Sequence, residues 1–239
     1  MDRTEVSSRR AIALAALCVV LAGCAPEPVT SQGARVKMLY DLFLVVAAVV
    51  FVVVAGLIGW SIVRYRDRDD GRRASVTHEN PRLELLWWAL PTLLVLGLFG
   101  VTAGVLSDVD RRTSDPAVTV EVTGFQWQWR FAYAGTERVV TGLPDAPAEI
   151  VLPIGQRIAF DLASPDVIHS FWVPRFLIKR DVVPGRTNRI ELTIEAEGTY
   201  RGLCGEFCGL LHDRMLFSIR AVPAEEFADW LAAPPEEGP

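Results

Sequence analysis

Hydrophobic residues are concentrated in two long runs near the start of the chain. Leu42–Val63 and Leu85–Ser107 span 22 and 23 residues without a charged side chain. At a rise of about 1.5 Å per residue, each run is long enough to cross a hydrocarbon core of about 30 Å. The pattern therefore predicts transmembrane helices over 38–63 and 84–107. Helices buried in a large soluble core are the alternative.

The segment that joins the two runs is rich in arginine. Residues 64–83 contain six arginines, and loops with an excess of Lys and Arg stay on the cytoplasmic side of a membrane. Both ends of the mature chain are therefore expected outside the cytoplasm. The chain is predicted to be a multi-pass protein of a bacterial plasma membrane, with 64–83 as its cytoplasmic loop.

Residues 1–23 have the pattern of an export signal of the lipoprotein type. Three arginines precede the apolar run Ala11–Leu21, which is too short to span a bilayer stably. The run ends in Leu-Ala-Gly-Cys, which resembles the cleavage box of bacterial lipoproteins and predicts lipidation of Cys24. An ordinary signal peptide or an uncleaved anchor remains open. Residues 24–37 would then form a short extracytoplasmic segment.

From Pro116 onward the pattern changes to short alternating runs broken by Gly and Pro. Val118–Tyr133 shows the alternation best, because its aromatic residues stand at odd-numbered positions (Phe125, Trp127, Trp129, Phe131 and Tyr133) and alternate with Gln126, Gln128 and Arg130. A period of two predicts one strand with two different faces. Further runs with strand character are 149–152, 156–163, 186–195, 198–203 and 215–222. Short strands at this spacing favour an all-β sandwich or barrel over 108–222. In 223–239, Pro223–Ala233 predicts an amphipathic helix before a short tail.

The formal charge divides unevenly along the chain. The whole chain carries −5, and the residues from Asp108 onward contain 20 acidic and 13 basic side chains. A negative outer domain excludes nucleic acid as an obvious partner and favours a basic protein partner. The alternative is that the negative charge serves only solubility.

Four side chains with soft metal-ligand chemistry lie within one twelve-residue loop. They are Cys204, Cys208, His212 and Met215. After the second apolar run, the only other Cys, His or Met is His169. Thiolate, imidazole and thioether together favour copper, and one cysteine would suffice for a single ion. A second cysteine lets two thiolates bridge two copper ions, which could share one electron.

Other interpretations of these residues remain open. Cys204 and Cys208 could form a disulfide, because an exported protein lies in an oxidising compartment. Zinc could bind both cysteines with His169 and His212, which would leave Met215 as a core residue. His169 could also be an ordinary core or surface histidine. The domain contains no recognisable nucleophile or general base, so electron transfer is favoured over bond cleavage.

The pattern Cys-x-Glu-x-Cys-x-x-x-His-x-x-Met, with an upstream His-Ser-Phe-Trp-Val-Pro, closely resembles the binuclear CuA site of cytochrome c oxidase subunit II. The resemblance runs from the first span to Val222. It implies a two-helix transmembrane hairpin and an all-β cupredoxin-like Greek-key sandwich. It also implies an electron-entry subunit that accepts electrons from cytochrome c. These would pass to the haem and copper centres of subunit I, where O2 is reduced to water with proton pumping.

The resemblance implies a role for each matching residue of the loop. His169 and His212 would each bind one copper, Cys204 and Cys208 would bridge the two, and Met215 would be an axial ligand. The backbone carbonyl of Glu206 would also bind copper. The Glu206 carboxylate would reach a magnesium ion shared with subunit I, a hard cation that prefers oxygen ligands.

The resemblance also assigns residues outside the loop. Trp127 would receive the electron from cytochrome c, although core packing is an alternative because four other aromatic residues share its expected face. Phe125 stands where the family often has histidine, a departure at the point of electron entry. Glu84 would lie at the entrance of a proton pathway, or simply face water at a span end. Expected partners are subunits I and III, a soluble or membrane-bound c-type cytochrome, a supercomplex and membrane lipid.

Three other protein classes share part of this pattern. The quinol-oxidase form of the subunit lacks the copper ligands that this chain has. Copper chaperones and thiol-redox proteins carry a Cys-x-x-x-Cys motif on a thioredoxin-like α/β fold, whereas the surroundings here predict β structure. A stand-alone blue-copper carrier needs one cysteine and no second membrane span.

Overall fold

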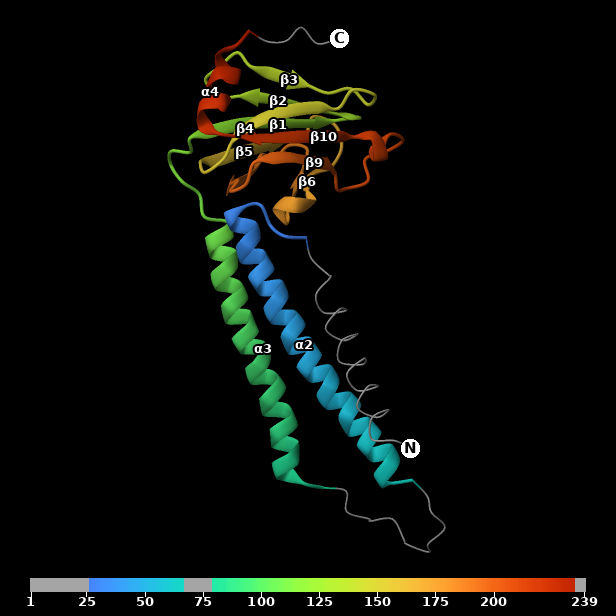
Figure 1. The fold of residues 1–239 in the computed structure, drawn as a ribbon. Helices are drawn as coiled ribbons and strands as arrows, with labels where there is room; N and C mark the ends of the chain where they lie inside the picture. The colour runs from blue at the N-terminus through green and yellow to red at the C-terminus, as the bar shows by residue number, and fades with distance from the viewer. Residues whose placement is uncertain (1–25, 67–78, 235–239) are drawn as a thin grey trace, which may run out of the picture. The chain divides into compact units, whose positions relative to one another are not determined.

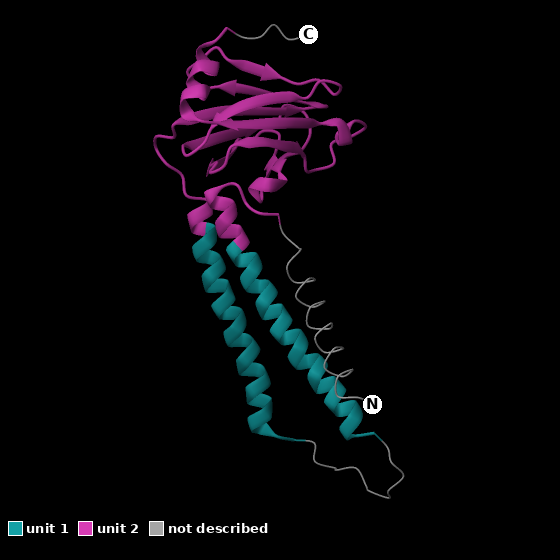
Figure 2. Cartoon of the chain, viewed as in Figure 1, with its two compact units in different colours: residues 1–24, 38–106 teal, residues 25–37, 107–239 magenta. Residues whose placement is uncertain are grey.

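The computed structural model describes residues 26–66 and 79–234 (Figure 1). These residues divide into two compact units. Among the described residues, one unit holds the membrane-type helices up to Leu106, and the other combines residues 26–37 with everything from Ser107 onward (Figure 2). The expected signal sequence, Cys24, most of the connecting loop and the last five residues lie outside the described part of the chain.

Two helices in the described chain are long and apolar enough to cross a membrane. They are α2, Ser31–Arg64, and α3, Pro81–Val109. Their apolar side chains are largely exposed, as expected of surfaces that lipid covers. α2 extends beyond the apolar run because the Thr30 hydroxyl accepts a hydrogen bond from the N–H of Gly33 and so caps the helix. Asn80 caps α3 in the same way, through the N–H of Leu83.

The second unit is built on two five-stranded β-sheets. The first sheet has the order β3-β2-β1-β5-β8, with β3 Val139–Thr141, β2 Gln128–Tyr133, β1 Val118–Phe125, β5 Arg157–Ala163 and β8 Asn188–Thr193. The second has the order β4-β10-β9-β6-β7, with β4 Ala148–Pro153, β10 Leu216–Val222, β9 Gly198–Cys204, β6 His169–Val173 and β7 Ile178–Val182. The short helix α4, Ala224–Ala232, follows β10. This arrangement confirms the predicted all-β cupredoxin-like sandwich joined to two apolar helices.

The segment Val118–Tyr133 is not one strand, as the alternation suggested, but a hairpin. The chain reverses at Gln126 and Trp127, whose peptide bond is cis, and Phe125 pairs with Gln128. Because paired residues of a hairpin point to the same face, Phe125 and Trp129 point to opposite faces of the sheet. The prediction that the five aromatic residues share one face is therefore wrong. Trp129 is buried in the core, whereas Trp127 lies in the turn.

Three strands were not expected from the sequence: β3, β6 and β7. β6 is buried at four of its five residues, so it shows no alternation of apolar and polar positions. β7 is an edge strand with three consecutive charged residues, which hide the strand pattern. The five other expected runs are strands whose ends differ by no more than two residues from the prediction.

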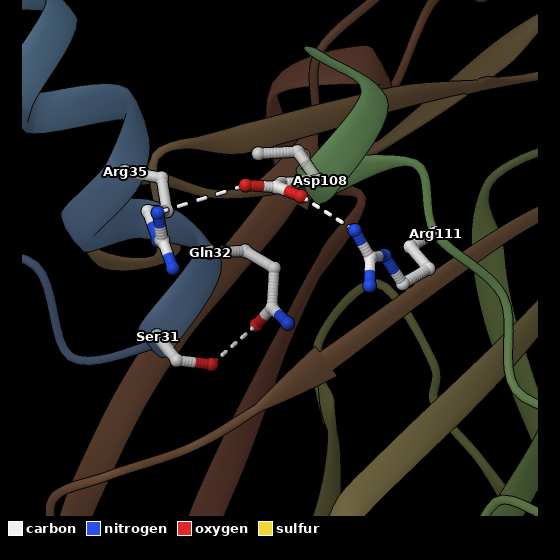
Figure 3. A pocket seen from close by; sticks show the side chains of 6 residues that line it. Ser31, Gln32, Arg35, Asp108 and Arg111 are labelled. Atoms are coloured by element: carbon white, nitrogen blue, oxygen red, sulfur yellow. Dashed lines mark hydrogen bonds and ion pairs between the residues drawn. The ribbon is translucent and has the colours of Figure 1, made fainter. Parts of the chain in front are cut away.

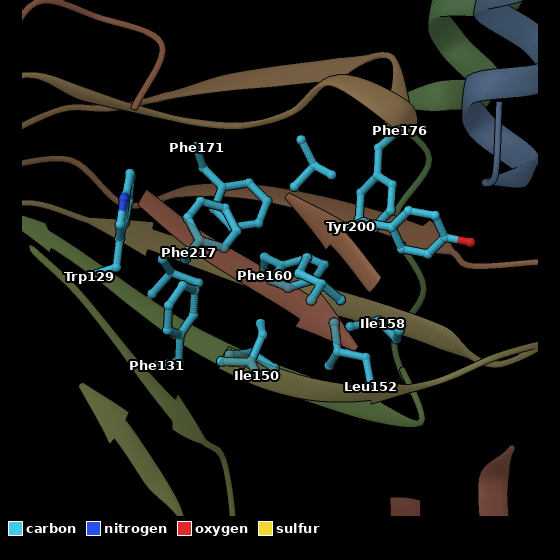
Figure 4. Close-up of a cluster of buried hydrophobic side chains, with 14 of the residues drawn as sticks. Trp129, Phe131, Ile150, Leu152, Ile158, Phe160, Phe171, Phe176, Tyr200 and Phe217 are labelled. Carbon is cyan, nitrogen blue, oxygen red and sulfur yellow. The ribbon is translucent and has the colours of Figure 1, made fainter. Parts of the chain in front are cut away.

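The core between the sheets is dominated by aromatic rings (Figure 4). The Phe217 ring stacks on that of Phe171 with centroids 4.9 Å apart, and lies 5.5 Å from Trp129 and 5.3 Å from Phe131. Gly202 pairs with Phe217 across β9 and β10. The Phe217 ring occupies the space that a side chain at Gly202 would fill.

Replacing Gly202 by alanine is expected to destabilise the sandwich by about 1–3 kcal/mol, because overpacking a filled core forces its neighbours out of position. The added methyl carbon would lie 2.1 Å from the Phe217 ring, which is enclosed by other aromatic rings. Thermal or denaturant unfolding of the full-length chain in detergent measures the effect. Arg201→Ala, at the exposed neighbouring position, is the matched control. Equal stability of the two variants would contradict this packing.

Candidate metal centre

The ligand-type residues are brought together by the ends of three adjacent strands. Cys204 ends β9 and Met215 immediately precedes β10, and the Cys204 N–H donates to the Met215 carbonyl over 3.0 Å. β6 runs beside β9 with Phe171 opposite Cys204. His169 is the first residue of β6 and therefore lies beside the cysteine although 35 residues separate them in the sequence.

Five potential ligand atoms form one cluster, in which His212 is half-buried and the other four residues are buried. The Cys204 and Cys208 sulfurs lie 3.9 Å apart, Nδ1 of His169 lies 3.9 Å from the Cys204 sulfur, and Nδ1 of His212 lies 3.6 Å from the Cys208 sulfur. The Met215 sulfur is 3.8 Å from that of Cys208. Ligands of one tetrahedral ion with bonds of 2.0–2.3 Å lie about 3.5 Å apart. The spacings therefore fit atoms that share metal ions.

The two thiols are not joined to each other. A disulfide bond is about 2.05 Å long, roughly half the observed separation of Cys204 and Cys208. Both cysteines are free and buried, which opposes the disulfide interpretation. Met215 is 1% exposed and directs its sulfur toward Cys208. A thioether in that position favours copper over zinc.

The two thiols differ in acidity. Burial raises the pKa of Cys204, but hydrogen bonds with His169 and nearby backbone groups outweigh this effect and lower it to about 7. Burial and the adjacent Cys204 thiolate raise the pKa of Cys208 to about 12. Near neutral pH the pair therefore retains a proton, which metal binding must displace.

Asp166 fixes the orientation of the fully buried His169. Nε2 of His169 lies 2.9 Å from the Asp166 carboxylate, which also accepts hydrogen bonds from the N–H groups of Gln126 and Val167. Partial burial opposes ionisation, but these hydrogen bonds lower the pKa of Asp166 to about 2. An ionised carboxylate holds the proton on Nε2 and leaves Nδ1 free to bind metal on the Cys204 side.

Asp166→Ala is expected to weaken copper binding by about 10–100-fold, the usual cost of losing a group that orients a histidine ligand. Asp166→Asn should show a smaller loss because its amide oxygen can still accept from Nε2. Competition with a copper chelator measures the affinity of the full-length protein. The exposed Asp229→Ala change is the control. Unchanged affinity in Asp166→Ala would show that His169 needs no such support.

The turn between β1 and β2 contacts the ligand loop directly. The Trp127 indole N–H donates to the Cys208 carbonyl over 3.2 Å, and the Gln126 amide donates to the same oxygen over 2.9 Å. A side chain on Gly209 would begin 3.1 Å from the indole nitrogen, so glycine permits the close approach. The half-buried Trp127 is therefore hydrogen-bonded directly to the backbone of a ligand residue.

The Glu206 carboxylate faces a cation from a neighbouring strand. Lys179 on β7 forms an ion pair with Glu206 and also donates to the carbonyl of Gly205 over 3.3 Å. The Glu206 carbonyl lies 3.2 Å from the Cys204 sulfur. Its backbone therefore faces the cluster while its carboxylate remains about 43% exposed.

The remaining predicted site residues are not part of this cluster. Glu84 lies in the first turn of α3, in the other compact unit, and Cys24 lies outside the described residues. Sequence reasoning assigned no structural role to three residues that contact the site: Asp166, Gln126 and Lys179. The spacing Asp-x-x-His before β6 was the available signal for Asp166.

Comparison with known proteins gives matches along most of the chain. The family described as "Cytochrome C oxidase subunit II, transmembrane domain" matches residues 26–102, and "Cytochrome C oxidase subunit II, periplasmic domain" matches residues 136–222. A probable cytochrome c oxidase subunit 2 of Streptomyces coelicolor is 35% identical, over 86% of this chain and 77% of the relative. A cytochrome c oxidase subunit 2 of Alkalihalophilus pseudofirmus is 31% identical, over 94% and 68%. The crystal structure of the subunit II periplasmic domain of Bradyrhizobium japonicum is 32% identical, covers 50% of this chain and 94% of that domain, and has a TM-score of 0.46.

Proposed function

This chain belongs to the cytochrome c oxidase subunit II family, and on that premise we propose that it is the electron-entry subunit of the oxidase. It would accept single electrons from a c-type cytochrome at a binuclear CuA centre. One observation carries the proposal: two unbonded thiols lie side by side, and each has the Nδ1 atom of a histidine within 4 Å.

The donor set fits two copper ions better than one. The two sulfurs would hold both ions, His169 and His212 would each offer one nitrogen, and the Met215 sulfur and the Glu206 carbonyl, which lie beside the thiols, would be weaker ligands. Bound there, the copper pair would supply a one-electron redox centre that shares its charge between two ions. The chain holds the ligands on strand ends and in a hydrogen-bonded loop. Ligands held in this way would move little when the centre gains or loses an electron, and a small change in geometry keeps the barrier to electron transfer low.

Trp127 is the proposed point of electron entry. It lies at the rim of the domain and donates a hydrogen bond to the carbonyl of Cys208. Three exposed apolar side chains, which we call the apolar rim, lie in the segments that carry the ligands. They are Ile168, Phe207 and Leu210, which are 49%, 81% and 83% exposed. Exposed apolar groups on an acidic domain suit a cytochrome with an apolar contact area and surrounding positive charge.

The electron would then pass to the haem and copper centres of subunit I. There O2 would be reduced to water with proton pumping, and Glu84 would lie at the entrance of one proton pathway. The Glu206 carboxylate would bind the magnesium ion shared with subunit I, where the cation would replace Lys179 as its partner. Subunit III, a supercomplex and a lipid on Cys24 complete the proposed assembly in a bacterial plasma membrane, with the copper domain on the extracytoplasmic side.

Electron acceptance tests the proposal directly. Copper-loaded full-length protein mixed with a reduced c-type cytochrome should oxidise it rapidly, with one electron taken up per copper pair. Copper-free protein, prepared with a chelator, is the control and should leave the cytochrome reduced. If the loaded protein bound copper but accepted no electron from any c-type cytochrome, another function would have to be sought.

A further inference from the structure

A pocket of about 220 Å³ lies where the first turn of α2 meets the end of α3 (Figure 3). Its lining residues are Ser31, Gln32, Arg35, Asp108, Val109 and Arg111. All of them belong to the same compact unit as the sandwich. A water molecule takes up about 30 Å³ of liquid volume, so the pocket has room for a group several times that size.

The pocket residues adjoin both apolar runs in the sequence. Asp108 directly follows Ser107, the last residue of the second run. Arg35 precedes the first run by seven residues, which is about 10 Å along a helix. The polar headgroups of a bilayer lie immediately outside its hydrocarbon core. The lining residues are therefore expected at the depth of the lipid phosphates.

Gln32 provides a further hydrogen-bond donor in this pocket. The residue is only 6% exposed, and its amide oxygen accepts hydrogen bonds from the N–H of Thr193 and the hydroxyl of Ser31. Within the described part of the chain, no group accepts a hydrogen bond from its amide nitrogen, which turns away from Ser31 (Figure 3). Because Arg180 Nε is the only buried side-chain nitrogen or oxygen without a partner in the described chain, the Gln32 nitrogen is open to the pocket and can donate to an oxygen-rich ligand.

Two guanidinium groups complete the donor set. Arg111 donates to the Asp108 carboxylate over 2.8 Å, and Arg35 lies 3.6 Å from the other carboxylate oxygen. Asp108 therefore holds both cations beside the pocket, and this trio keeps one net positive charge. Each guanidinium has five N–H donors, most of which remain available. The N-terminal end of α2 adds a favourable field for an anion.

We propose that this pocket binds the phosphate group of a membrane phospholipid. Arginine donors match phosphate oxygens in paired geometry, and the Gln32 amide supplies a further donor from the pocket wall. Free phosphate has the same chemistry, but the location beside two membrane spans favours the lipid. The site is independent of the copper centre and of electron transfer.

Lipid retention by the full-length protein in detergent tests the proposal. Native mass spectrometry with added phosphatidylglycerol should show one tightly held lipid. Arg111→Gln should weaken it by about tenfold or more, because a charge-assisted hydrogen bond is lost. Gln32→Glu should also weaken it, because a carboxylate would face the phosphate. Arg186→Gln, at an exposed turn elsewhere in the domain, is the matched control and should retain the lipid.

Two results would overturn the proposal. One is unchanged lipid retention in Arg111→Gln, an exposed position whose replacement should not prevent folding. The other comes from an arm with inorganic phosphate alone. If phosphate bound the pocket as tightly as the lipid and displaced it, the site would be one for a free anion. The unfolding temperature of each variant shows whether a loss of lipid reflects a loss of fold.

Discussion

Replacing Cys204 by serine is expected to abolish the shared copper centre while the sandwich remains folded. A serine hydroxyl is a hard, neutral group that does not bridge two copper ions as a thiolate does. The remaining Cys208, His212 and Met215 would support at most one copper. Copper content should therefore fall from two ions to at most one per chain, and electron uptake from cytochrome should be lost.

Metal analysis and paramagnetic resonance of the full-length variant measure this effect. Cys208→Ser should behave in the same way, because both sulfurs occupy the centre of the cluster. Ser218→Ala, on β10 and outside the cluster, is the control and should keep the normal copper content. A Cys204→Ser protein that still held two coppers with a shared electron would contradict the bridging role.

Replacing Trp127 by alanine is expected to slow electron entry strongly without removing copper. Buried interface tryptophans often contribute about 2–4 kcal/mol to binding, so the second-order rate constant should fall by roughly 30-fold or more. The indole also joins the domain rim to the Cys208 carbonyl. Stopped-flow oxidation of reduced cytochrome c measures the rate constant in the full-length protein.

The Trp127→Phe variant separates the aromatic contact from the indole hydrogen bond. It keeps a ring for docking and loses only the donor to Cys208, so its rate constant should lie between those of the wild type and Trp127→Ala. Copper spectra of both variants should match the wild type. Loss of copper would show that Trp127 serves the structure of the loop, and an unchanged rate would show that electrons enter elsewhere.

Features written in local sequence patterns could be predicted. The two apolar runs predicted α2 and α3 because membrane insertion depends on a continuous stretch of side chains. The ligand loop predicted a metal site because its residues lie within twelve positions of one another. His169 was assigned through its resemblance to a known pattern, and its place beside Cys204 follows from the pairing of β6 with β9.

Features that depend on packing between distant segments could not be predicted in this way. Alternation from Phe125 to Tyr133 continues through the turn at Gln126 and Trp127 and so hides the reversal of the chain. Its trace is a shift of the apolar positions from even-numbered, in Val118–Val122, to odd-numbered from Phe125 onward. The hydrogen bonds from this turn to Cys208 join residues more than 80 positions apart. Lys179 was missed for a similar reason, because only the fold of β7 places it beside Glu206.

The copper content and paramagnetic spectrum of the full-length protein isolated from its native membrane test the proposed binuclear centre. We expect two copper ions per chain and one unpaired electron divided equally between two nuclei. A disulfide between Cys204 and Cys208 with no bound metal, or the hyperfine pattern of a single copper ion, would contradict that proposal.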